Sequence, residues 1–229
     1  MTPPLAAERS RPEVVAFDVN ETLLDLAPVR AALVEAGRPA QELRTVFART
    51  LLTGFAALAV GRWCSFRDAF DAALAQETDL APDDRSLVAD AFGELSPHPD
   101  VEPALARLVE AGIRVVTLSH GSPGVAEAGL ARGGVVPLVE RSLSSESIRA
   151  WKPAREVYLW AAGNCGVAPE RMALVAAHGW DVQGAQRAGL TGAWFPRGER
   201  VYPPVYDRPH VAADDLAGAV DALLGLPTA

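Results

Sequence analysis

Short apolar runs that each end on a small or polar residue recur along this chain, and they limit its fold more than any other feature. "VVAF" ends at Asp18, "IRVVTL" at Ser119, "MALVAA" at His178 and "TGAWF" at Pro196, with helical patterns between them. Continuous apolar strands that alternate with helices indicate a parallel sheet covered on both faces. The sequence therefore predicts an α/β fold with a doubly wound parallel sheet.

The ends of these runs carry the candidate functional residues. Ligands of open parallel sheets bind at the carboxyl ends of the strands, where Asp18, Ser119 and the segment from His178 to Asp181 fall. An aspartate in such a place either caps the next turn or acts as a nucleophile that forms a covalent ester or acyl phosphate. The convergence of three polar strand ends favours a catalytic site.

The interval 26–97 breaks the alternation of strands and helices. It contains no good strand and reads as several helices, one of which carries Leu51, Leu52, Phe55 and Leu58 on one face. Three prolines in "SPHPDVEP" mark the return to the sheet. We expect a small helical cap at 26–97, inserted after the first strand, a core formed by 12–25 and 98–229, and a disordered leader at 1–11.

The composition limits the partners of this chain. A net charge of -8 and a pI near 5.0 argue against nucleic acid and against an anionic membrane surface. No apolar stretch approaches the roughly 20 residues that span a bilayer. Cys64 and Cys165 lie far apart and outside any metal-binding pattern, which predicts free thiols. We expect a cytoplasmic protein with a small-molecule substrate.

The stretch "LSHGSP" contains a serine next to a histidine, but it does not fit a serine hydrolase. A nucleophile elbow has the pattern G-x-S-x-G, and Ser122 has His120 at the first glycine position. Pro123 follows Ser122 and has no N–H for an oxyanion hole. The pattern favours an anion-binding turn formed by Ser119 and the following backbone amides, while His120 is equally compatible with an ordinary loop.

Two further motifs could complete a site around Asp18. Lys152 in "AWKPAREVY" is either a solvated lysine or a cation that keeps Asp18 ionised. Asp181 in "HGWDVQGAQRAG" is either an ordinary residue of a helix N-terminus or a second carboxylate near Asp18. The glycines at 184 and 189 predict close packing of that helix on a strand.

Taken in order, "FDVNETL", "LSHGSP", "WKPAREVY" and "HGWDVQGAQRAG" resemble the four motifs of the haloacid dehalogenase-like superfamily, in particular type II 2-haloacid dehalogenases. The resemblance runs through nearly the whole chain. It implies a Rossmann-like core, a small helical cap and Asp18 as the nucleophile. It also implies that the protein is a hydrolase and a possible homodimer.

Two positions separate dehalogenases from the phosphatases of this superfamily. Phosphatases carry a second aspartate two residues after the nucleophile, which protonates the leaving group, and this chain has Asn20 there. Ala177 occupies a position at which phosphatases usually have an acidic metal ligand. A halide leaves without a proton, so we expect no cofactor. The alternative is Mg²⁺ at Asp18 and Asp181.

The resemblance implies a mechanism in which Asp18 displaces the halide from a small 2-haloalkanoic acid, and water then hydrolyses the ester to give the 2-hydroxy acid. Thr22 and Lys152 would hold Asp18, while Asp181 and His178 would orient the water. The substrate-binding residues implied in this way are Val19, Asn20, Arg49, Ser119, His120, Tyr158, His178 and Trp180.

The chain also departs from the pattern of type II dehalogenases. Those enzymes have an aromatic–glycine pair where Asn20 and Glu21 stand, and asparagines where His120 and His178 stand. Arg49 is the nearest candidate for their halide-binding arginine, and Glu21 could restore an acid. A magnesium-dependent phosphatase, another hydrolase of a small metabolite, and a catalytically silent binding protein remain the alternatives.

Overall fold

The computed structural model describes residues 9–228, so that most of the predicted leader, residues 1–8, lies outside the described residues. The end of that predicted leader packs on the core. Arg9 donates a hydrogen bond to the carbonyl of Gly189, and the backbone N–H of Arg11 donates to the carbonyl of Pro227. The prediction of disorder is therefore wrong for residues 9–11.

The core is a six-stranded sheet in which all neighbouring strands are parallel, in the order β5-β4-β1-β6-β7-β8. Its strands are β1 (Val14–Phe17), β4 (Arg114–Ser119), β5 (Arg141–Ser144), β6 (Met172–Ala176), β7 (Thr191–Trp194) and β8 (Val211–Ala212). The predicted α/β class with a parallel sheet is confirmed. β1 lies between β4 and β6, which brings the ends of the three apolar runs together at one edge.

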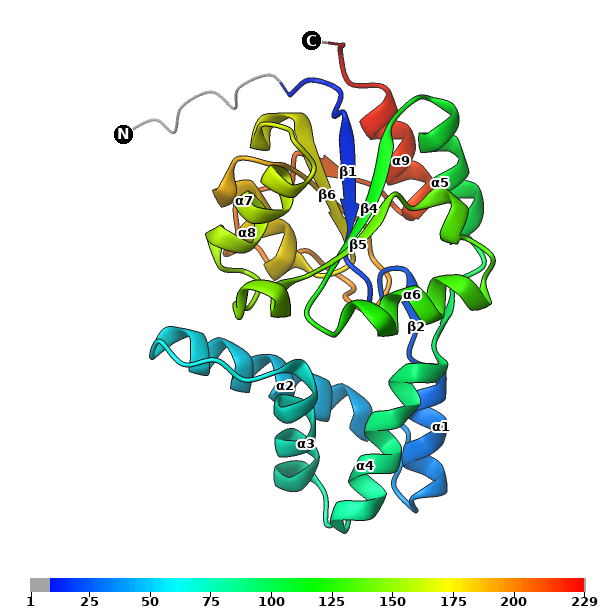
Figure 1. The fold of residues 1–229 in the computed structure, drawn as a ribbon, viewed down its shortest axis with the longest axis vertical. Helices are drawn as coiled ribbons and strands as arrows, with labels where there is room; N and C mark the ends of the chain where they lie inside the picture. The colour runs from blue at the N-terminus through cyan, green and yellow to red at the C-terminus, as the bar shows by residue number, and fades with distance from the viewer. Residues whose placement is uncertain (1–8, 229) are drawn as a thin grey trace.

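Helices cover both faces of this sheet (Figure 1). One face packs against α5 (Val101–Glu110) and α9 (Leu216–Leu224), and the other packs against α7 (Arg155–Asn164) and α8 (Gly179–Ala188). Side chains of β1 alternate between these layers, since Val15 faces α5 and α9 while Val14 faces α7 and α8. A strand that is buried on both faces must be apolar throughout, which explains the run "VVAF".

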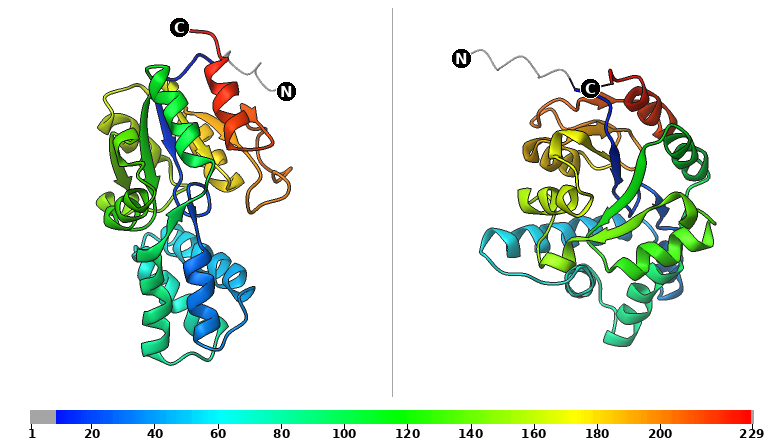
Figure 2. Two further views of the ribbon diagram at one scale, coloured as in Figure 1. Left: turned by 90° about the vertical axis from the view of Figure 1, so that its right-hand side faces the viewer. Right: turned by 45° about the horizontal axis from the view of Figure 1, so that its top comes forward.

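A second group of helices, which we call the cap, lies beyond the carboxyl ends of the strands, away from both termini (Figures 1 and 2). They are α1 (Ala27–Glu35), α2 (Glu42–Ala59), α3 (Phe66–Glu77), α4 (Pro82–Asp90) and the short 3-10 helix η1 (Ala91–Glu94). A small antiparallel ribbon of β2 (Leu24–Asp25) and β3 (Ser96–Pro97) joins them to the core. The core also contains α6 (Pro123–Arg132) and the 3-10 helices η2 (Val136–Leu138), η3 (Ser145–Ile148) and η4 (Pro169–Arg171).

The cap and the core are in direct contact at Trp151. Its indole N–H donates to the carbonyl of Cys64 over 2.9 Å, and the ring packs on Gly54 of α2. A Cβ added at Gly54 would lie 2.4 Å from the indole ring, so only glycine permits this approach. This contact fixes the height of α2 above the sheet.

The buried face of α2 differs from the predicted one. The residues that α2 buries are Leu43, Val46, Phe47, Thr50 and Gly54. Leu52, which the sequence placed on the apolar face, is 53% exposed. The helix α2 lies between α3 and the strand ends. Because it is contacted on two sides, its buried residues do not form a single apolar stripe.

Candidate active site

Asp18 lies at the end of β1, where it is buried beneath the cap. Its Oδ1 accepts a hydrogen bond from Lys152 Nζ at 2.7 Å, and its Oδ2 accepts one from Thr22 Oγ1 at 2.7 Å. His178 Nδ1 lies 2.9 Å from the same Oδ2. Burial alone would raise the pKa of Asp18, but Lys152 and His178 lower it well below its usual range. The carboxylate is therefore ionised and held by three donors.

Lys152 is the only lysine in the chain, and its side chain is fully buried. Its ammonium has three N–H donors and three acceptors, which are Asp18 Oδ1 at 2.7 Å, Asp181 Oδ2 at 2.7 Å and the carbonyl of Leu118 at 2.8 Å. Burial favours the neutral amine, but the two carboxylates raise the pKa of Lys152. A compact ammonium satisfies this arrangement, whereas the flat guanidinium of an arginine does not.

Asp181 lies in the first turn of α8 and is fully buried. Besides Lys152, it accepts a hydrogen bond from the Tyr158 hydroxyl at 2.6 Å. Burial raises the pKa of Asp181, and Lys152 opposes this shift. Gly184 permits the arrangement, because a Cβ there would lie 2.6 Å from both the Tyr158 hydroxyl and Pro153. The close packing predicted for Gly184 is thus against α7 and the loop before it, not against a strand.

His178 connects the strand-end carboxylate to a second acid. Its Nε2 lies 3.1 Å from Glu21 Oε2, while Nδ1 faces Asp18. Burial would lower the pKa of His178, but the hydrogen bonds to Asp18 and Glu21 raise it to about 10. His178 is therefore an imidazolium between two carboxylates. The side chain of Glu21 is 32% exposed, so this row of groups runs from the buried site to solvent.

The backbone of Glu21 is strained in a way that supports this contact. Its φ is 62°, in the left-handed region that non-glycine residues rarely adopt. Backbone hydrogen bonds from Leu23 and Leu24 to the carbonyl of Val19, and from Glu21 to Leu24, hold the loop closed. Residues whose backbone is held in such a strained conformation cluster at functional sites. Glu21 occupies a position whose backbone would suit glycine, and its carboxylate reaches His178 from there.

His120 takes a different protonation state from His178. Burial and the nearby Lys152 hold the pKa of His120 well below its usual value. Its neutral ring donates from Nε2 to the carbonyl of Lys152 over 3.2 Å and stacks on Trp180, with ring centroids 5.5 Å apart. Trp180 also lies beneath the Lys152 ammonium at 5.7 Å. Of the two histidines near Asp18, His120 is thus neutral and His178 is cationic.

The segment Ser119 to Ser122 forms a turn between β4 and α6. The Ser119 hydroxyl donates to the carbonyl of Gly121 over 2.9 Å. Ser122 is the N-cap of α6, and its side chain makes no capping hydrogen bond. The first amides of a helix have no intrahelical acceptor, and they form a positive end that attracts anions. This turn can bind a carboxylate.

A small enclosed cavity of about 10 Å³ lies against Asp18, with Asn20, Ser119, His120, His178 and Trp180 in its wall. This volume suits a single water molecule. Phe47, Leu51 and Phe66 of the cap close it from the other side. Phe47 and Phe66 are largely buried in the core, and they also line the site.

The structure does not bring Arg49 to this cavity. Arg49 Nε forms an ion pair with Glu77 at 2.6 Å, on the side of α2 that faces α3. An α-helix turns about 100° per residue, so a shift of one position moves a side chain to another face. Ala48 precedes Arg49 and lines a hollow beside His178. A halide-binding role for Arg49 therefore has no geometric support.

The carboxylates do not form a magnesium site. Lys152 Nζ lies 2.7 Å from both Asp18 and Asp181, in the space that a bridging cation would need. The other oxygens of the two carboxylates accept from Thr22, His178 and Tyr158. Mg²⁺ requires an octahedral set of oxygen ligands, and this donor set does not supply one. Within residues 9–228, no group of three or more His, Cys, Asp and Glu side chains could hold a metal ion.

A parallel sheet that presents a buried aspartate–lysine pair beneath inserted helices defines a capped enzyme of the α/β class with an aspartate at its centre. The chain belongs to the haloacid dehalogenase-like hydrolase family, whose family model matches residues 12–189. The resemblance found in the sequence is thereby confirmed. In the described part of the chain, no helix has the length and the apolar composition needed to cross a membrane.

Two known relatives are similar over almost their entire length. An (S)-2-haloacid dehalogenase of Pseudomonas putida, H-109, is 27% identical over 219 residues, which cover 93% of this chain and 98% of the relative. Haloacetate dehalogenase H-2 of Moraxella sp. is 28% identical, with coverages of 93% and 97%. The similarity thus includes both the core and the inserted helices.

Solved structures show the same fold. L-2-haloacid dehalogenase from Xanthobacter autotrophicus superposes with a TM-score of 0.83 at 23% identity and covers 94% of this chain and 99% of its own. A predicted phosphoglycolate phosphatase from Haemophilus somnus superposes with a TM-score of 0.66 at 19% identity, with coverages of 93% and 98%. Because both superpose, the fold alone does not separate dehalogenation from phosphate hydrolysis.

Proposed function

We propose that this protein is a metal-independent hydrolase that converts small 2-haloalkanoic acids to 2-hydroxy acids through an ester on Asp18. One observation carries the proposal: all four carboxylate oxygens of Asp18 and Asp181 are already engaged by donors of the protein, so the site presents an ionised carboxylate and no pair open to a cation. The similarity to 2-haloacid dehalogenases over more than nine-tenths of the chain supports the choice of substrate.

In the first step, a carboxylate oxygen of Asp18 attacks the carbon that bears the halogen, and the carbon–halogen bond breaks as the carbon–oxygen bond forms. The halide leaves with the electron pair and needs no proton, which accords with Asn20 in place of an acid. The low pKa of Asp18 keeps it ionised for this attack. Asn20 lies in the same cavity and carries two N–H donors for the departing anion.

The substrate carboxylate binds at the turn between β4 and α6. There Ser119 and the backbone amides that follow it before Pro123 provide hydrogen bonds, as the sequence predicts. Ser119 lines the cavity that also contains Asp18, so a carboxylate at this turn places the adjacent carbon next to the nucleophile. The cap rings of Phe47 and Phe66 exclude water from this carbon.

In the second step, water attacks the carbonyl carbon of the Asp18 ester, and the bond from that carbon to the substrate oxygen breaks. Asp18 returns as a carboxylate, and the 2-hydroxy acid leaves with one proton of the water. Ester formation removes the charge of Asp18, which is one of the causes of the raised pKa of His178. His178 then loses its proton more readily and can accept one from the attacking water, while Glu21 stabilises the imidazolium that results. The proton leaves through Glu21, which lines a hollow of about 440 Å³ beside His178.

Halide release in the presence of a chelator tests the proposed chemistry directly. We expect chloride and bromide to be released from 2-chloropropanoate and bromoacetate at the same rate with and without EDTA, because Lys152 supplies the cation of the site. Ion chromatography measures this release. Loss of activity with EDTA that added Mg²⁺ restores, or phosphate release from small phosphoesters without any halide release, would refute the proposal.

Glu21→Gln should separate the two steps. The amide keeps the size of the side chain but removes its charge, so His178 becomes a weaker base and kcat falls by about 10²-fold. Halide release in the first turnover should persist, and acid-quenched mass spectrometry should find substrate bound to Asp18. Glu199→Gln is the matched control, since Glu199 lines the same hollow but bonds the backbone of Gly179. Release of halide and hydroxy acid at the same rate in the first turnover of Glu21→Gln would exclude a role of Glu21 in the second step.

A further inference from the structure

A cavity of about 300 Å³ adjoins the small cavity at Asp18, and the steps above use none of its wall beyond Asn20 and the turn at Ser119. Asn20, Phe66 and Ser119 line both spaces, so the two lie side by side. We name the larger one the side chamber. Its volume lies at the lower end of the range for small-molecule sites, whereas the cavity at Asp18 has room for about one water.

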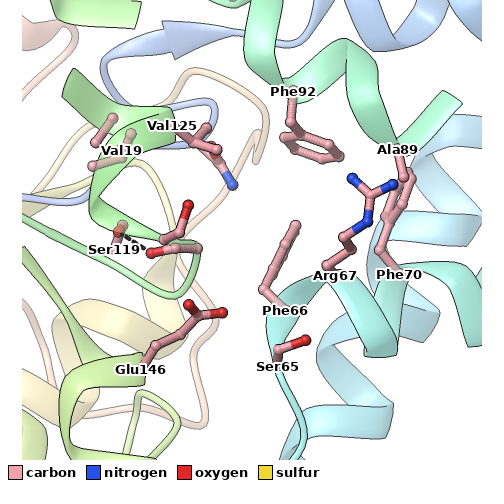
Figure 3. A pocket seen from close by; sticks show the side chains of 14 residues that line it. Val19, Ser65, Phe66, Arg67, Phe70, Ala89, Phe92, Ser119, Val125 and Glu146 are labelled. Atoms are coloured by element: carbon pink, nitrogen blue, oxygen red, sulfur yellow. Dashed lines mark hydrogen bonds between the residues drawn. The ribbon is translucent and has the colours of Figure 1, made fainter. Parts of the chain in front are cut away.

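Apolar side chains form most of the wall of the side chamber. The core contributes Val19 and Val125, and the cap contributes Phe66, Phe70, Ala89 and Phe92 (Figure 3). Phe92 meets the two other rings edge to face, with its ring centroid 5.3 Å from that of Phe66 and 5.0 Å from that of Phe70. Such a cluster offers faces and edges on which another ring can pack.

Besides Asn20 and the turn from Ser119 to Ser122, the polar groups of the side chamber are Ser65, Arg67 and Glu146 at its rim. The Arg67 guanidinium forms an ion pair with Asp90 at 2.7 Å, so its charge is compensated. Glu146 of η3 faces the chamber from the core, opposite Ser65 (Figure 3), and no salt bridge to it is found among residues 9–228. Burial raises the pKa of Glu146, as expected for a carboxylate without a cation beside it. A second anion in the chamber would meet this carboxylate.

The chamber is a fixed feature of the fold and not a gap that the cap can close freely. Trp151 holds α2 through Gly54 and bonds the carbonyl of Cys64, next to the start of α3. The β2–β3 ribbon holds the other end of the cap. With both attachments in place, the space between Val125 and Phe92 remains for a ligand.

From this geometry we infer that the substrate is a 2-haloacid with a bulky, uncharged apolar group, such as an aromatic ring, on the carbon next to the halogenated one. The inference rests on the proposed function and specifies its substrate class. With the substrate carboxylate at Ser119 and the reacting carbon at Asp18, the side chain extends past Asn20 and Phe66 into the side chamber. Bulk that packs there adds binding energy at a distance from the reacting bond.

The first experiment compares kcat/KM for 2-chloro-3-phenylpropanoate and 2-chloropropanoate. We expect the phenyl compound to be preferred at least tenfold, since even one methylene in an apolar site is worth roughly that factor. Ala89→Leu fills the chamber and should lower this ratio at least tenfold. Ala31→Leu, the same change at an exposed position of α1, should leave the ratio as it is. A wild-type ratio near one, or an unchanged ratio in a folded Ala89→Leu protein, overturns the inference.

Glu146→Gln gives a second measurement that does not depend on filling the chamber. The wild type should discriminate against the dicarboxylate 2-chlorobutanedioate, and the variant should raise its kcat/KM relative to 2-chloropropanoate at least tenfold. An unchanged ratio counts against the inference. This variant alters a rim side chain and leaves the apolar packing intact.

A binding experiment separates failure of the chamber from failure of the reaction. If neither chloro acid releases halide, the proposed function is wrong. Calorimetric titration with 3-phenylpropanoate and with propanoate still tests the chamber. At least tenfold tighter binding of the phenyl acid, lost in Ala89→Leu, supports the chamber without any turnover. Equal affinity for the two acids overturns it.

Discussion

Asp18→Asn should reduce halide release by at least about 10³-fold, because an amide oxygen cannot form the ester through which the reaction proceeds. The variant should still fold, since Lys152 keeps its ion pair with Asp181 and the amide oxygen can accept a hydrogen bond from Thr22. Halide release over hours by ion chromatography, together with circular dichroism, measures both expectations.

Asp25→Asn is the matched control for this change. It removes a carboxylate from the same loop, but Asp25 is partly exposed and pairs with Arg30. We expect its halide release to stay close to that of the wild type. If Asp18→Asn retained more than a tenth of the wild-type rate, Asp18 would not be the nucleophile, and the proposed ester would have to be abandoned.

Lys152→Met should have the largest effect on stability. The change leaves Asp18 and Asp181 buried without their shared cation, and breaking a buried ion pair by removing one partner costs roughly 3–5 kcal/mol. Activity should be lost at the same time, because the pKa of Asp18 rises when Lys152 is absent. Urea denaturation at neutral pH measures the free energy of unfolding.

A double variant distinguishes the electrostatic cost from lost packing. Lys152→Met with Asp181→Asn removes one of the two stranded carboxylates, so it should be more stable than Lys152→Met alone while remaining inactive. Lys152→Arg should be inactive as well, since the guanidinium does not match three acceptors around one point. Wild-type stability of Lys152→Met would show that the buried pair contributes little.

The centre of the fold could be predicted from the sequence, but its edges could not. β1, β4 and β6 are buried on both faces, so each is a continuous apolar run that the sequence displays directly. β5 reads "RSLS" and β8 has only two residues. Short or polar edge strands protect a sheet from further pairing, and this removes the pattern that would reveal them.

The candidate site, too, could be predicted only in part. Strand ends placed Asp18, Ser119 and His178 at one edge of the sheet, and the structure brings them together at one cavity. The contact between Glu21 and His178 depends on a left-handed backbone at Glu21, which its residue type disfavours. Arg49 shows the opposite error, because residue type alone suggested a role that its face of α2 does not permit.

The single lysine has a practical consequence for studying this enzyme. Apart from the amino terminus, the only primary amine in the chain is the one enclosed between Asp18 and Asp181. Reagents that acylate amines should therefore leave the folded protein almost unlabelled, and they can react with Lys152 only when the cap and the core separate or the chain unfolds. The chain thus carries a built-in chemical reporter for the integrity of its own active site.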